Sequence, residues 1–244
     1  MKHIFLQTTT STNDDAINFI CRSDFAEKMV IFAQHQTQGR GTRGRVWDSP
    51  KKAVLATLIY PLMHPISQYT GVTLSIGVAI ARVLRQMGFP VQVKWPNDII
   101  CGGKKLAGIL VEQAQSLKGQ KAFVIGIGLN IELSAQYKDR IAINELRTLT
   151  PNEVDDLGEC LIQAIDKCLQ EFEALGFEPT FKCWSQYGAY AGRFVDVFHD
   201  ESKYLSGQLK GINTQGSLII VNSNGEHCVT SGTLRVRGEY DCTC

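Results

Sequence analysis

Gly39-Arg40-Gly41-Thr42-Arg43-Gly44-Arg45-Val46-Trp47 follows a short apolar segment, residues 29–34, that has the composition of a strand. Its first seven residues include three glycines and three arginines. Glycine lets a ligand approach backbone N–H groups closely, and arginine offers a rigid fork of donors to a carboxylate or phosphate. The stretch therefore predicts a loop that binds an anionic ligand, and a solvated basic loop without function is the alternative. A P-loop is excluded, because Gly-x-x-x-x-Gly-Lys-Ser/Thr is absent.

Strand-like and helix-like periods alternate on both sides of this loop. Apolar runs typical of strands occupy residues 1–7, 29–34, 53–60, 91–94, 106–112 and 122–129. Helical spacing marks a segment after Ser11 or Thr12, which suit a helix N-cap, and residues 68–87, 151–174 and 179–187. The turn-forming Cys101-Gly102-Gly103 separates the 91–94 and 106–112 strands. This alternation predicts an α+β fold.

After residue 190 the pattern changes to short strands alone. They are predicted at residues 194–198, 204–210, 217–221 and 233–236, and Asn224-Gly225 is a strong hairpin signal. We therefore expect two domains, an α+β domain over residues 1–190 and a small all-β barrel over residues 191–244.

The composition is that of an ordinary globular protein, with 44% hydrophobic and 20% charged residues. The formal net charge is +1 and no block of like charges occurs, so general attraction to nucleic acid or anionic lipid is not expected. The start of the chain turns polar too soon for a signal peptide, and no apolar run reaches the roughly 20 residues that span a bilayer. We expect a cytoplasmic protein. Its eight cysteines, Cys242 and Cys244 included, are expected to be reduced thiols that form no metal site.

Three further motifs follow the loop, each with an ordinary structural alternative. Lys94-Trp95-Pro96-Asn97-Asp98 ends a strand with a proline and two polar side chains, as a plain strand-to-turn junction also does. Lys104-Lys105-Leu106-Ala107-Gly108-Ile109-Leu110 puts lysines at the mouth of an apolar strand, where most lysines are simply solvated. Gly126-Ile127-Gly128-Leu129-Asn130 lacks the third glycine of a dinucleotide fingerprint. It predicts either a buried strand with close backbone neighbours or a strand end that presents Asn130 to a nucleobase.

Together with Ser11-Thr12-Asn13, these motifs resemble the pattern of the biotin protein ligases, also called biotin–[acetyl-CoA-carboxylase] ligases. The order and approximate spacing agree over nearly the whole chain: Ser-Thr-Asn, Gln-x-x-Gly-Arg-Gly-x-x-Gly-Arg-x-Trp, Lys-Trp-Pro-Asn-Asp, Lys-Leu-Ala-Gly-Ile-Leu and Gly-x-Gly-x-Asn. The resemblance implies a class II synthetase-like biotin/lipoate ligase domain, with a mixed β-sheet and helices, and an SH3-like C-terminal barrel. Because the first motif begins at residue 11, it also implies the monofunctional class without an N-terminal DNA-binding domain.

The implied reaction has two steps. The biotin carboxylate attacks the α-phosphate of ATP to give biotinyl-5′-AMP, and a lysine of a biotin carboxyl carrier protein domain then attacks the acyl carbonyl and expels AMP. Negative charge builds up on oxygens in both steps, so preorganised cationic donors lower both barriers. Mg²⁺ is expected with ATP. No nucleic-acid partner and no membrane are expected, and the chain is expected to be a monomer or homodimer.

Residue roles are implied by position in the motifs. The biotin site is expected to consist of Ser11, Thr12, Asn13, Gln36, Arg40, Gly41, Thr42 and Lys105. The ATP or adenylate site is expected to consist of Arg43, Trp47, Asn97 and Asn130. Lys105 is expected to bridge the biotin carboxylate and the α-phosphate as a point charge, and Asp98 to orient the incoming amine or Mg²⁺. No protein-bound metal site is expected.

One position departs from the family pattern, because Thr42 stands where arginine is common. In the family that arginine helps to retain the adenylate until the carrier arrives. The absence of an arginine at position 42 predicts weaker retention of the adenylate, although Arg40, Arg43 and Arg45 remain in the same loop.

Two alternative functions stay open. A lipoate or octanoate protein ligase or transferase shares the catalytic fold, but it is not expected to carry the Gly-Arg-Gly-x-x-Gly-Arg loop or the Lys-Trp-Pro-Asn-Asp motif. A non-catalytic adenylate sensor would need no carrier docking and would tolerate the loss of Lys105, so the presence of this lysine argues against a sensor.

Overall fold

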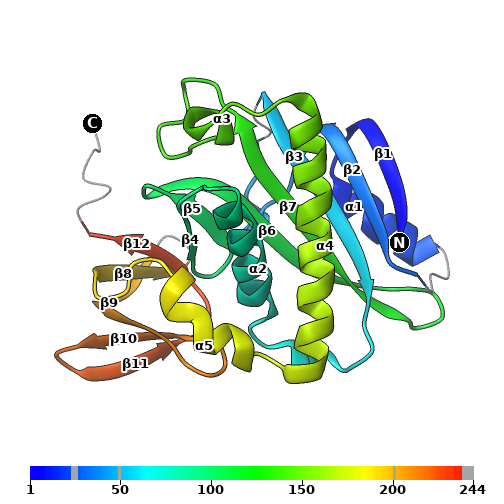
Figure 1. The fold of residues 1–244 in the computed structure, drawn as a ribbon. Helices are drawn as coiled ribbons and strands as arrows, with labels where there is room; N and C mark the ends of the chain where they lie inside the picture. The colour runs from blue at the N-terminus through cyan, green and yellow to red at the C-terminus, as the bar shows by residue number, and fades with distance from the viewer. Residues whose placement is uncertain (23–26, 49–50, 200–201, 238–244) are drawn as a thin grey trace. The chain divides into compact units, whose positions relative to one another are not determined.

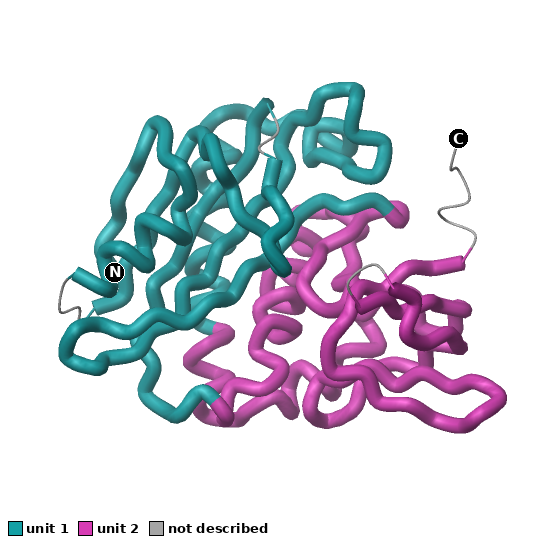
Figure 2. The backbone as a smooth tube through the Cα atoms, turned by 180° about the vertical axis from the view of Figure 1, so that it is seen from behind, with its two compact units in different colours: residues 1–66, 104–167 teal, residues 67–103, 168–244 magenta. Residues whose placement is uncertain are grey.

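The computed structural model describes residues 1–22, 27–48, 51–199 and 202–237, and the chain divides into two compact units (Figure 2). Unit 1 comprises residues 1–66 and 104–167, and unit 2 comprises residues 67–103 and 168–244. The domain boundary expected near residue 190 is a different division, based on the change to short strands, and it stays a prediction. Among the described residues, none of the helices combines the length and the apolar character needed to cross a bilayer.

Unit 1 is built on five strands in the order β1-β2-β3-β7-β6 (Figure 1). They are β1 (Lys2–Thr9), β2 (Met29–Gln36), β3 (Lys52–Pro61), β6 (Lys104–Gln115) and β7 (Lys121–Glu132). β1 pairs with β2 in parallel, and the other neighbours pair antiparallel. The sheet is therefore mixed, as the resemblance implies.

Helices cover both faces of this sheet (Figure 1). On one face α1 (Thr12–Arg22) packs in a cluster that includes Ile31. On the other face Gly158, in the first half of α4 (Pro151–Leu175), lies against Phe32, since a Cβ built on it would be 3.3 Å from that ring. Successive residues of a strand point to opposite faces of the sheet. Ile31 and Phe32, which follow each other in β2, therefore contact different helices.

Unit 2 contains the hairpin of β4 (Val91–Lys94) and β5 (Asp98–Cys101), the helices α2 (Val72–Gln86) and α5 (Glu178–Tyr187), and a five-stranded sheet. The sheet has the order β11-β10-β9-β8-β12, with every neighbour antiparallel. Its strands are β8 (Phe194–His199), β9 (Ser202–Ile212), β10 (Leu218–Asn222), β11 (Gly225–Val229) and β12 (Thr233–Val236). This sheet is consistent with a small SH3-like domain, and its closure into a barrel stays a prediction.

Two parts of the expected element pattern differ from the structure. The helix expected over residues 68–87 is interrupted, and η2 (Ile66–Tyr69) precedes α2, because Gly71 has a φ of 85° in the left-handed region. A Cβ on Gly71 would lie 2.6 Å from the ring of Phe177, so a side chain is excluded there. The sequence pattern does not indicate β5, α3 (Ile143–Leu146) or β11. β5 lacks the alternation of apolar and polar residues that marks the equally short β4, α3 is too short to show a helical period, and β11 is largely polar.

Candidate functional site

One face of the unit 1 sheet, the face covered by α1, carries most of the expected site. Thr57 of β3 pairs with Gly126 of β7, and Gly108 of β6 pairs with Gly128 of β7. Residues two apart on a strand point to the same face, so both glycines of the Gly-x-Gly motif lie on the face of Thr57. Their missing side chains leave room there for Asn13 and for the end of the Gly/Arg-rich loop.

A buried polar cluster, made of Thr12, Asn13, Gln36 and Thr57, lies at the start of α1. Gln36 Oε1 accepts the backbone N–H of Thr12 at 2.8 Å and lies 3.0 Å from the Thr12 hydroxyl. The Thr57 hydroxyl lies 2.7 Å from both Thr12 Oγ1 and Asn13 Oδ1. Ser11, directly before the helix, is 1% exposed. The structure thus brings together four residues expected in the biotin site, Ser11, Thr12, Asn13 and Gln36, and Thr57 joins them.

Gly126 makes room for this cluster. A Cβ on Gly126 would lie 2.3 Å from Asn13 Oδ1, so any side chain there would displace the amide. The other end of the amide is fixed as well, because Asn13 Nδ2 donates to Glu112 Oε2 at 2.8 Å and an ionised carboxylate only accepts. The glycine motif was expected to have close backbone neighbours, but at this position the close neighbour is the side chain of Asn13.

The guanidinium of Arg40 is held between two carboxylates. Its Nη1 and Nη2 donate to Glu112 at 2.9 and 2.7 Å, and its Nε lies 2.8 Å from Asp14 Oδ1. Burial lowers the pKa of Arg40, but the hydrogen bonds and charges of Glu112 and Asp14 raise it by more, so its pKa lies above the usual value. Arg40 therefore ties the loop to β6 and α1, and its contact with a ligand stays a prediction.

The loop from Gly39 to Trp47 is a narrow backbone hairpin. The Gly41 N–H donates to the Arg45 carbonyl at 2.7 Å, and the Trp47 N–H donates to the Gly39 carbonyl at 2.8 Å. At the tip lies η1 (Thr42–Gly44), in which Arg43 has a φ of 58°, in the left-handed region. The Arg43 side chain is exposed, so it is accessible to an anion, and its expected contact with phosphates stays a prediction.

The indole of Trp47 lies against two facing glycines. Cβ atoms built on Gly128 and Gly108 would lie 2.3 and 3.0 Å from the ring. Lys105 Nζ lies 5.5 Å from the ring centroid, within cation–π range. Trp47 Nε1 is buried and has no hydrogen-bond partner in the part of the chain that the structure describes. Lys105 and Trp47, expected to contact opposite parts of one adenylate, are neighbours.

Asn130 is fully buried near the start of β6. Its Nδ2 donates to the carbonyls of Lys105 at 3.3 Å and Ile141 at 3.1 Å. Both partners only accept, so the amide orientation is determined and Oδ1 is an acceptor. Among residues 1–22, 27–48, 51–199 and 202–237, no donor reaches this buried oxygen. Asn130 therefore has one acceptor available for an amino group such as that of adenine.

Asn97 and Asp98 belong to unit 2. Asn97 is 9% exposed in the turn after β4, and Asp98 begins β5 opposite Lys94. In the same motif Trp95 is 4% exposed and its Nε1 donates to the Gly216 carbonyl at 3.1 Å. The motif is thus anchored within its own unit, which a plain solvated turn would not be. The roles of Asn97 and Asp98 toward ATP, Mg²⁺ or an amine stay predictions.

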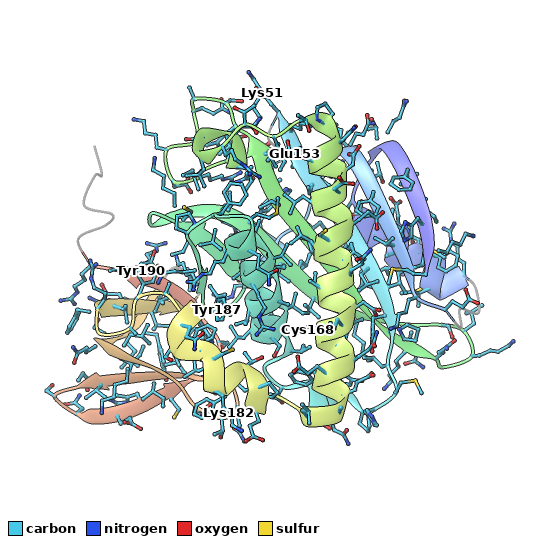
Figure 3. The ribbon with its side chains drawn as sticks, viewed as in Figure 1. Lys51, Glu153, Cys168, Lys182, Tyr187 and Tyr190 are labelled. Carbon is cyan, nitrogen blue, oxygen red and sulfur yellow. The ribbon has the colours of Figure 1, made fainter. Side chains whose placement is uncertain are left out.

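The described residues contain no group of three or more His, Cys, Asp or Glu side chains that could hold a metal ion. Six cysteines in this part of the chain are free, while Cys242 and Cys244 lie outside the described residues. Burial raises the pKa of Cys168, labelled on α4 in Figure 3, to about 12, so this thiol is neutral at neutral pH.

Comparison with known proteins gives the family. The model of the Biotin/lipoate A/B protein ligase family matches residues 5–131, over half of the chain. The chain belongs to this family. The matched segment includes every unit 1 residue of the expected site, and the Asn97–Asp98 pair as well.

Relatives in the family carry ligase names. A bifunctional ligase/repressor of Salmonella typhimurium is 34% identical over 77% of this chain and 60% of its own length. The chain spans about 60% of the length of that relative and of its Escherichia coli counterpart. A biotin–[acetyl-CoA-carboxylase] ligase of Paracoccus denitrificans is 26% identical over 94% of this chain and 98% of its own.

The fold is shared with a solved member of the family. A biotin protein ligase from Aquifex aeolicus, solved in complex with biotin and ATP, has a TM-score of 0.81. It is 23% identical, and the match covers 97% of this chain and 98% of that one. This agreement establishes the biotin protein ligase fold, with a mixed sheet, helices and a C-terminal antiparallel sheet.

Three residues that contact the expected site residues lie outside the motifs. Thr57 and Glu112 contact Asn13, and Asp14 contacts Arg40. Thr57 is the only polar residue in the apolar run 53–60, and Glu112 ends an otherwise apolar segment. A polar residue inside a buried strand needs a hydrogen-bond partner, so the sequence at both positions indicates a polar contact although neither lies in a motif.

Proposed function

We propose that this chain activates biotin with ATP to biotinyl-5′-AMP and transfers the biotinyl group to a lysine of a biotin carboxyl carrier protein domain. The observation that carries the proposal is the placement of the polar cluster, Trp47 and Lys105 on one sheet face. A ligand with a hydrogen-bonding head group and an anionic acyl phosphate would meet complementary groups there. The name of the Paracoccus denitrificans relative supports the same reaction.

In the first step the polar cluster orients the ureido ring, with Ser11 beside it. A biotin carboxylate oxygen then attacks the α-phosphorus of ATP, the bond from phosphorus to the bridging oxygen of the β-phosphate breaks, and pyrophosphate leaves. The ammonium of Lys105 stabilises the charge on the oxygens between the reacting groups. Mg²⁺ enters this scheme with ATP, as the ion chelated by its phosphates.

The adenosine part of ATP would be held by groups next to Lys105. Trp47 packs against the adenine, and Asn130 Oδ1 accepts a hydrogen bond from the adenine amino group. Arg43 contacts the phosphates and Asn97 the ribose or a phosphate, as their positions in the family motifs imply. The buried Asn130 Oδ1, to which no group in the described part of the chain donates, supports this placement most directly.

In the second step the carrier lysine, as the free amine, attacks the acyl carbonyl. The carbon–oxygen bond to AMP breaks, AMP leaves, and the attacking nitrogen loses a proton to give the amide. As its position in the family motif implies, Asp98 would orient the amine or Mg²⁺ for this attack, and correct positioning of the reacting groups lowers the barrier. Cytoplasmic location, the absence of a nucleic-acid partner, and a monomeric or homodimeric state stay predictions.

Lipoate or octanoate transfer is the second candidate, because the family model covers both kinds of ligase. An alkyl chain or dithiolane ring offers no N–H or carbonyl to the polar cluster. Gln36 Oε1 and the Thr12 hydroxyl already have partners, but Gln36 Nε2 donates to no group among the described residues, so burying it against such a ligand would leave a donor unpaired at a cost of about 1–3 kcal/mol. The cluster therefore favours biotin.

The test is a mass measurement on a carrier. An apo biotin carboxyl carrier domain is incubated with the chain, ATP and either biotin or lipoate, and its acceptor Lys→Arg variant is the control. We expect the mass of one biotinyl group to be added to the carrier, only with biotin and ATP and only when the acceptor lysine is present. Modification by lipoate alone would assign the second candidate. Formation of biotinyl-5′-AMP without transfer would indicate an adenylate sensor.

A further inference from the structure

The outer side of β1 is an open edge of the unit 1 sheet. β1 is the first strand in the order of the sheet and pairs with β2 on one side (Figure 1). Within the described residues, no strand pairs with its other side. We propose that this edge pairs antiparallel with β1 of a second copy of the chain and so forms a homodimer. The proposal concerns assembly and does not depend on the proposed function.

The edge lacks the features that usually protect an exposed strand. Such features are a short strand, charged side chains, proline, a bulge or a covering segment. β1 has eight residues without proline or glycine, and Lys2, near one end, is its only residue with a formal charge at neutral pH. In the middle of the strand, Phe5 is 71% exposed. A long edge with an exposed aromatic residue at its centre favours pairing with another strand.

The backbone of β1 determines which residues can bind that strand. The Lys2 N–H donates to the Lys28 carbonyl at 3.1 Å, so Lys2 directs its backbone groups to β2. This direction alternates along a strand, so His3, Phe5 and Gln7 direct their N–H and C=O groups to the open edge. Two antiparallel strands bind through opposite residues that exchange both of their hydrogen bonds. The groups available to a second copy are therefore those of His3, Phe5 and Gln7.

A two-fold axis at Phe5 uses all of these groups. Antiparallel pairing about this axis places Phe5 opposite Phe5 of the second copy, and His3 opposite Gln7 of the second copy. A shift by two residues moves a pair to the end of the strand, where the Thr9 carbonyl already accepts from the Thr37 N–H at 2.9 Å. A shift by one residue sets the available groups against residues that bind β2. The register centred on Phe5 therefore forms the most hydrogen bonds.

The side chains match in this register on both faces of the sheet. On the face of α4 the rings of Phe5 and Phe32 stack at a centroid distance of 5.3 Å, so the rings of both copies would form one continuous row. On the face of α1, Ile4 lies opposite Leu6 of the second copy, and both residues pack against the core cluster of their own copy. Aromatic and apolar pairs across strands stabilise a sheet. This self-complementarity favours a second copy over an unrelated strand.

The charges agree with the same pairing. Lys2 lies opposite Thr8 of the second copy, which precedes Thr9. The Thr9 hydroxyl donates to Asp15 Oδ2 at 2.6 Å, and Asp15 belongs to the first turn of α1. The ammonium of Lys2 would therefore meet the acidic start of α1 of the second copy, on the face of the sheet that both share.

Analytical ultracentrifugation of the full chain is the first test. We expect wild type to dimerise at about 100 μM or below. Phe5→Glu and Phe5→Lys each set like charges opposite each other at the axis, so each should raise the dissociation constant about tenfold or more. Met63→Glu is the matched control, because it adds a carboxylate to unit 1 at a side chain that is 75% exposed. A monomeric wild type, or equal loss of the dimer in Met63→Glu and Phe5→Glu, would overturn the proposal.

A mixture of the two Phe5 variants tests the register. In the mixture, unlike charges lie opposite each other at the axis, so we expect a heterodimer although neither variant dimerises alone. Damage to the fold would not be repaired by mixing. The absence of a heterodimer would overturn the register centred on Phe5.

Gln7→Pro tests the backbone hydrogen bonds. Proline at this position removes an N–H that is directed to the open edge, so the edge strand tolerates it within one copy. Gln7→Ala is the matched control, since it shortens the side chain and keeps the N–H. We expect the dissociation constant of Gln7→Pro to exceed that of Gln7→Ala about fivefold or more. Equal constants would exclude backbone pairing through β1.

Hydrogen exchange tests the position of the interface without a substitution. Peptides that cover residues 2–9 of wild type should exchange more slowly at about 100 μM than at about 1 μM, because the N–H groups of Phe5 and Gln7 gain partners in the dimer. A β8–β9 peptide should exchange equally at both concentrations. A dimer in which exchange over residues 2–9 does not depend on concentration would overturn the assignment to β1.

Discussion

The indole of Trp47 covers Gly128 so closely that a Cβ built on that glycine would lie 2.3 Å from the Cζ2 atom of the ring. Gly108, opposite Gly128 on the neighbouring strand, leaves room for the same ring. The end of the Gly/Arg-rich loop and the second glycine of the Gly-x-Gly motif are therefore parts of one structural feature. Because the ring occupies this space, even the single methyl group of an alanine at position 128 is expected to destabilise the protein.

Gly128→Ala is predicted to displace the indole and to lower the free energy of unfolding by about 1–3 kcal/mol, the usual cost of overpacking. Denaturant unfolding measures this change. In a Trp47→Ala background the same substitution should cost clearly less, since the atoms that the new methyl group would meet are gone. An equal cost in both backgrounds would mean that the ring does not occupy the space above Gly128.

Lys105→Ala is predicted to slow formation of biotinyl-5′-AMP by about 10² or more, the usual effect of removing a preorganised charge stabiliser. Lys105 Nζ lies 5.5 Å from the Trp47 ring, beside the proposed adenine contact. The neighbouring, exposed Lys104 provides the control, and Lys104→Ala should leave the rate within about twofold. Pyrophosphate release is the measurement, and release at the parental rate in Lys105→Ala would remove the lysine from the mechanism.

The sequence predicts the local elements of this fold better than it predicts the site. The continuous apolar run of β3 and the helical spacing of apolar residues in α4 can be recognised along the chain, whereas the four residues of β5 show neither. The hydrogen bonds of the polar cluster join residues far apart in sequence: Thr57 and Asn13 are 44 positions apart, and Asn13 and Glu112 are 99. Spacing alone carries no information about such pairs.

The motifs predict the site residues that lie together, but they do not include Thr57, Glu112 and Asp14, which bind the side chains of those residues. Ser11, Thr12, Asn13 and Gln36 were expected from the resemblance, and the structure places them together. Glu112 belongs to a strand that was expected to end with it, and its contact with Arg40 depends on the folded path of the loop. The long-range partner of a charged residue follows from the tertiary structure.

Hydrogen exchange over residues 39–47 is predicted to slow markedly when biotin and ATP are added, because three glycines leave the loop little intrinsic stiffness. The N–H groups of Gly41 and Trp47 already have backbone partners within the hairpin, at 2.7 and 2.8 Å. Their exchange should be the slowest within the loop in both states. Mass spectrometry of the loop peptide, with a β8–β9 peptide as reference, gives the comparison. Exchange that is insensitive to both ligands would exclude a gating role.

The side chain at position 42 tests whether the departure from the family pattern has a consequence. Thr42 Oγ1 lies 3.2 Å from Arg45 Nη2 and brings no charge to the loop. Arg40 is engaged by Glu112 and Asp14, so it is poorly placed to replace an arginine at this position. Exposed Arg43 is the neighbour that could supply the same contact to an adenylate.

Thr42→Arg is predicted to slow the release of biotinyl-5′-AMP by roughly 10-fold to 150-fold, the range expected for one charge-assisted hydrogen bond, and to leave its formation nearly unchanged. The wild-type chain would then release activated biotin to bystander lysines more readily than the variant does. Val46→Arg adds the same charge to the same loop at a side chain that is 73% exposed, so it controls for net charge. Dissociation of labelled biotinyl-5′-AMP after a chase is timed in all three proteins. Equal rates in wild type and Thr42→Arg would mean that Arg43 already makes the contact, whereas equal slowing by Val46→Arg would assign the effect to general attraction, since both variants gain the same charge.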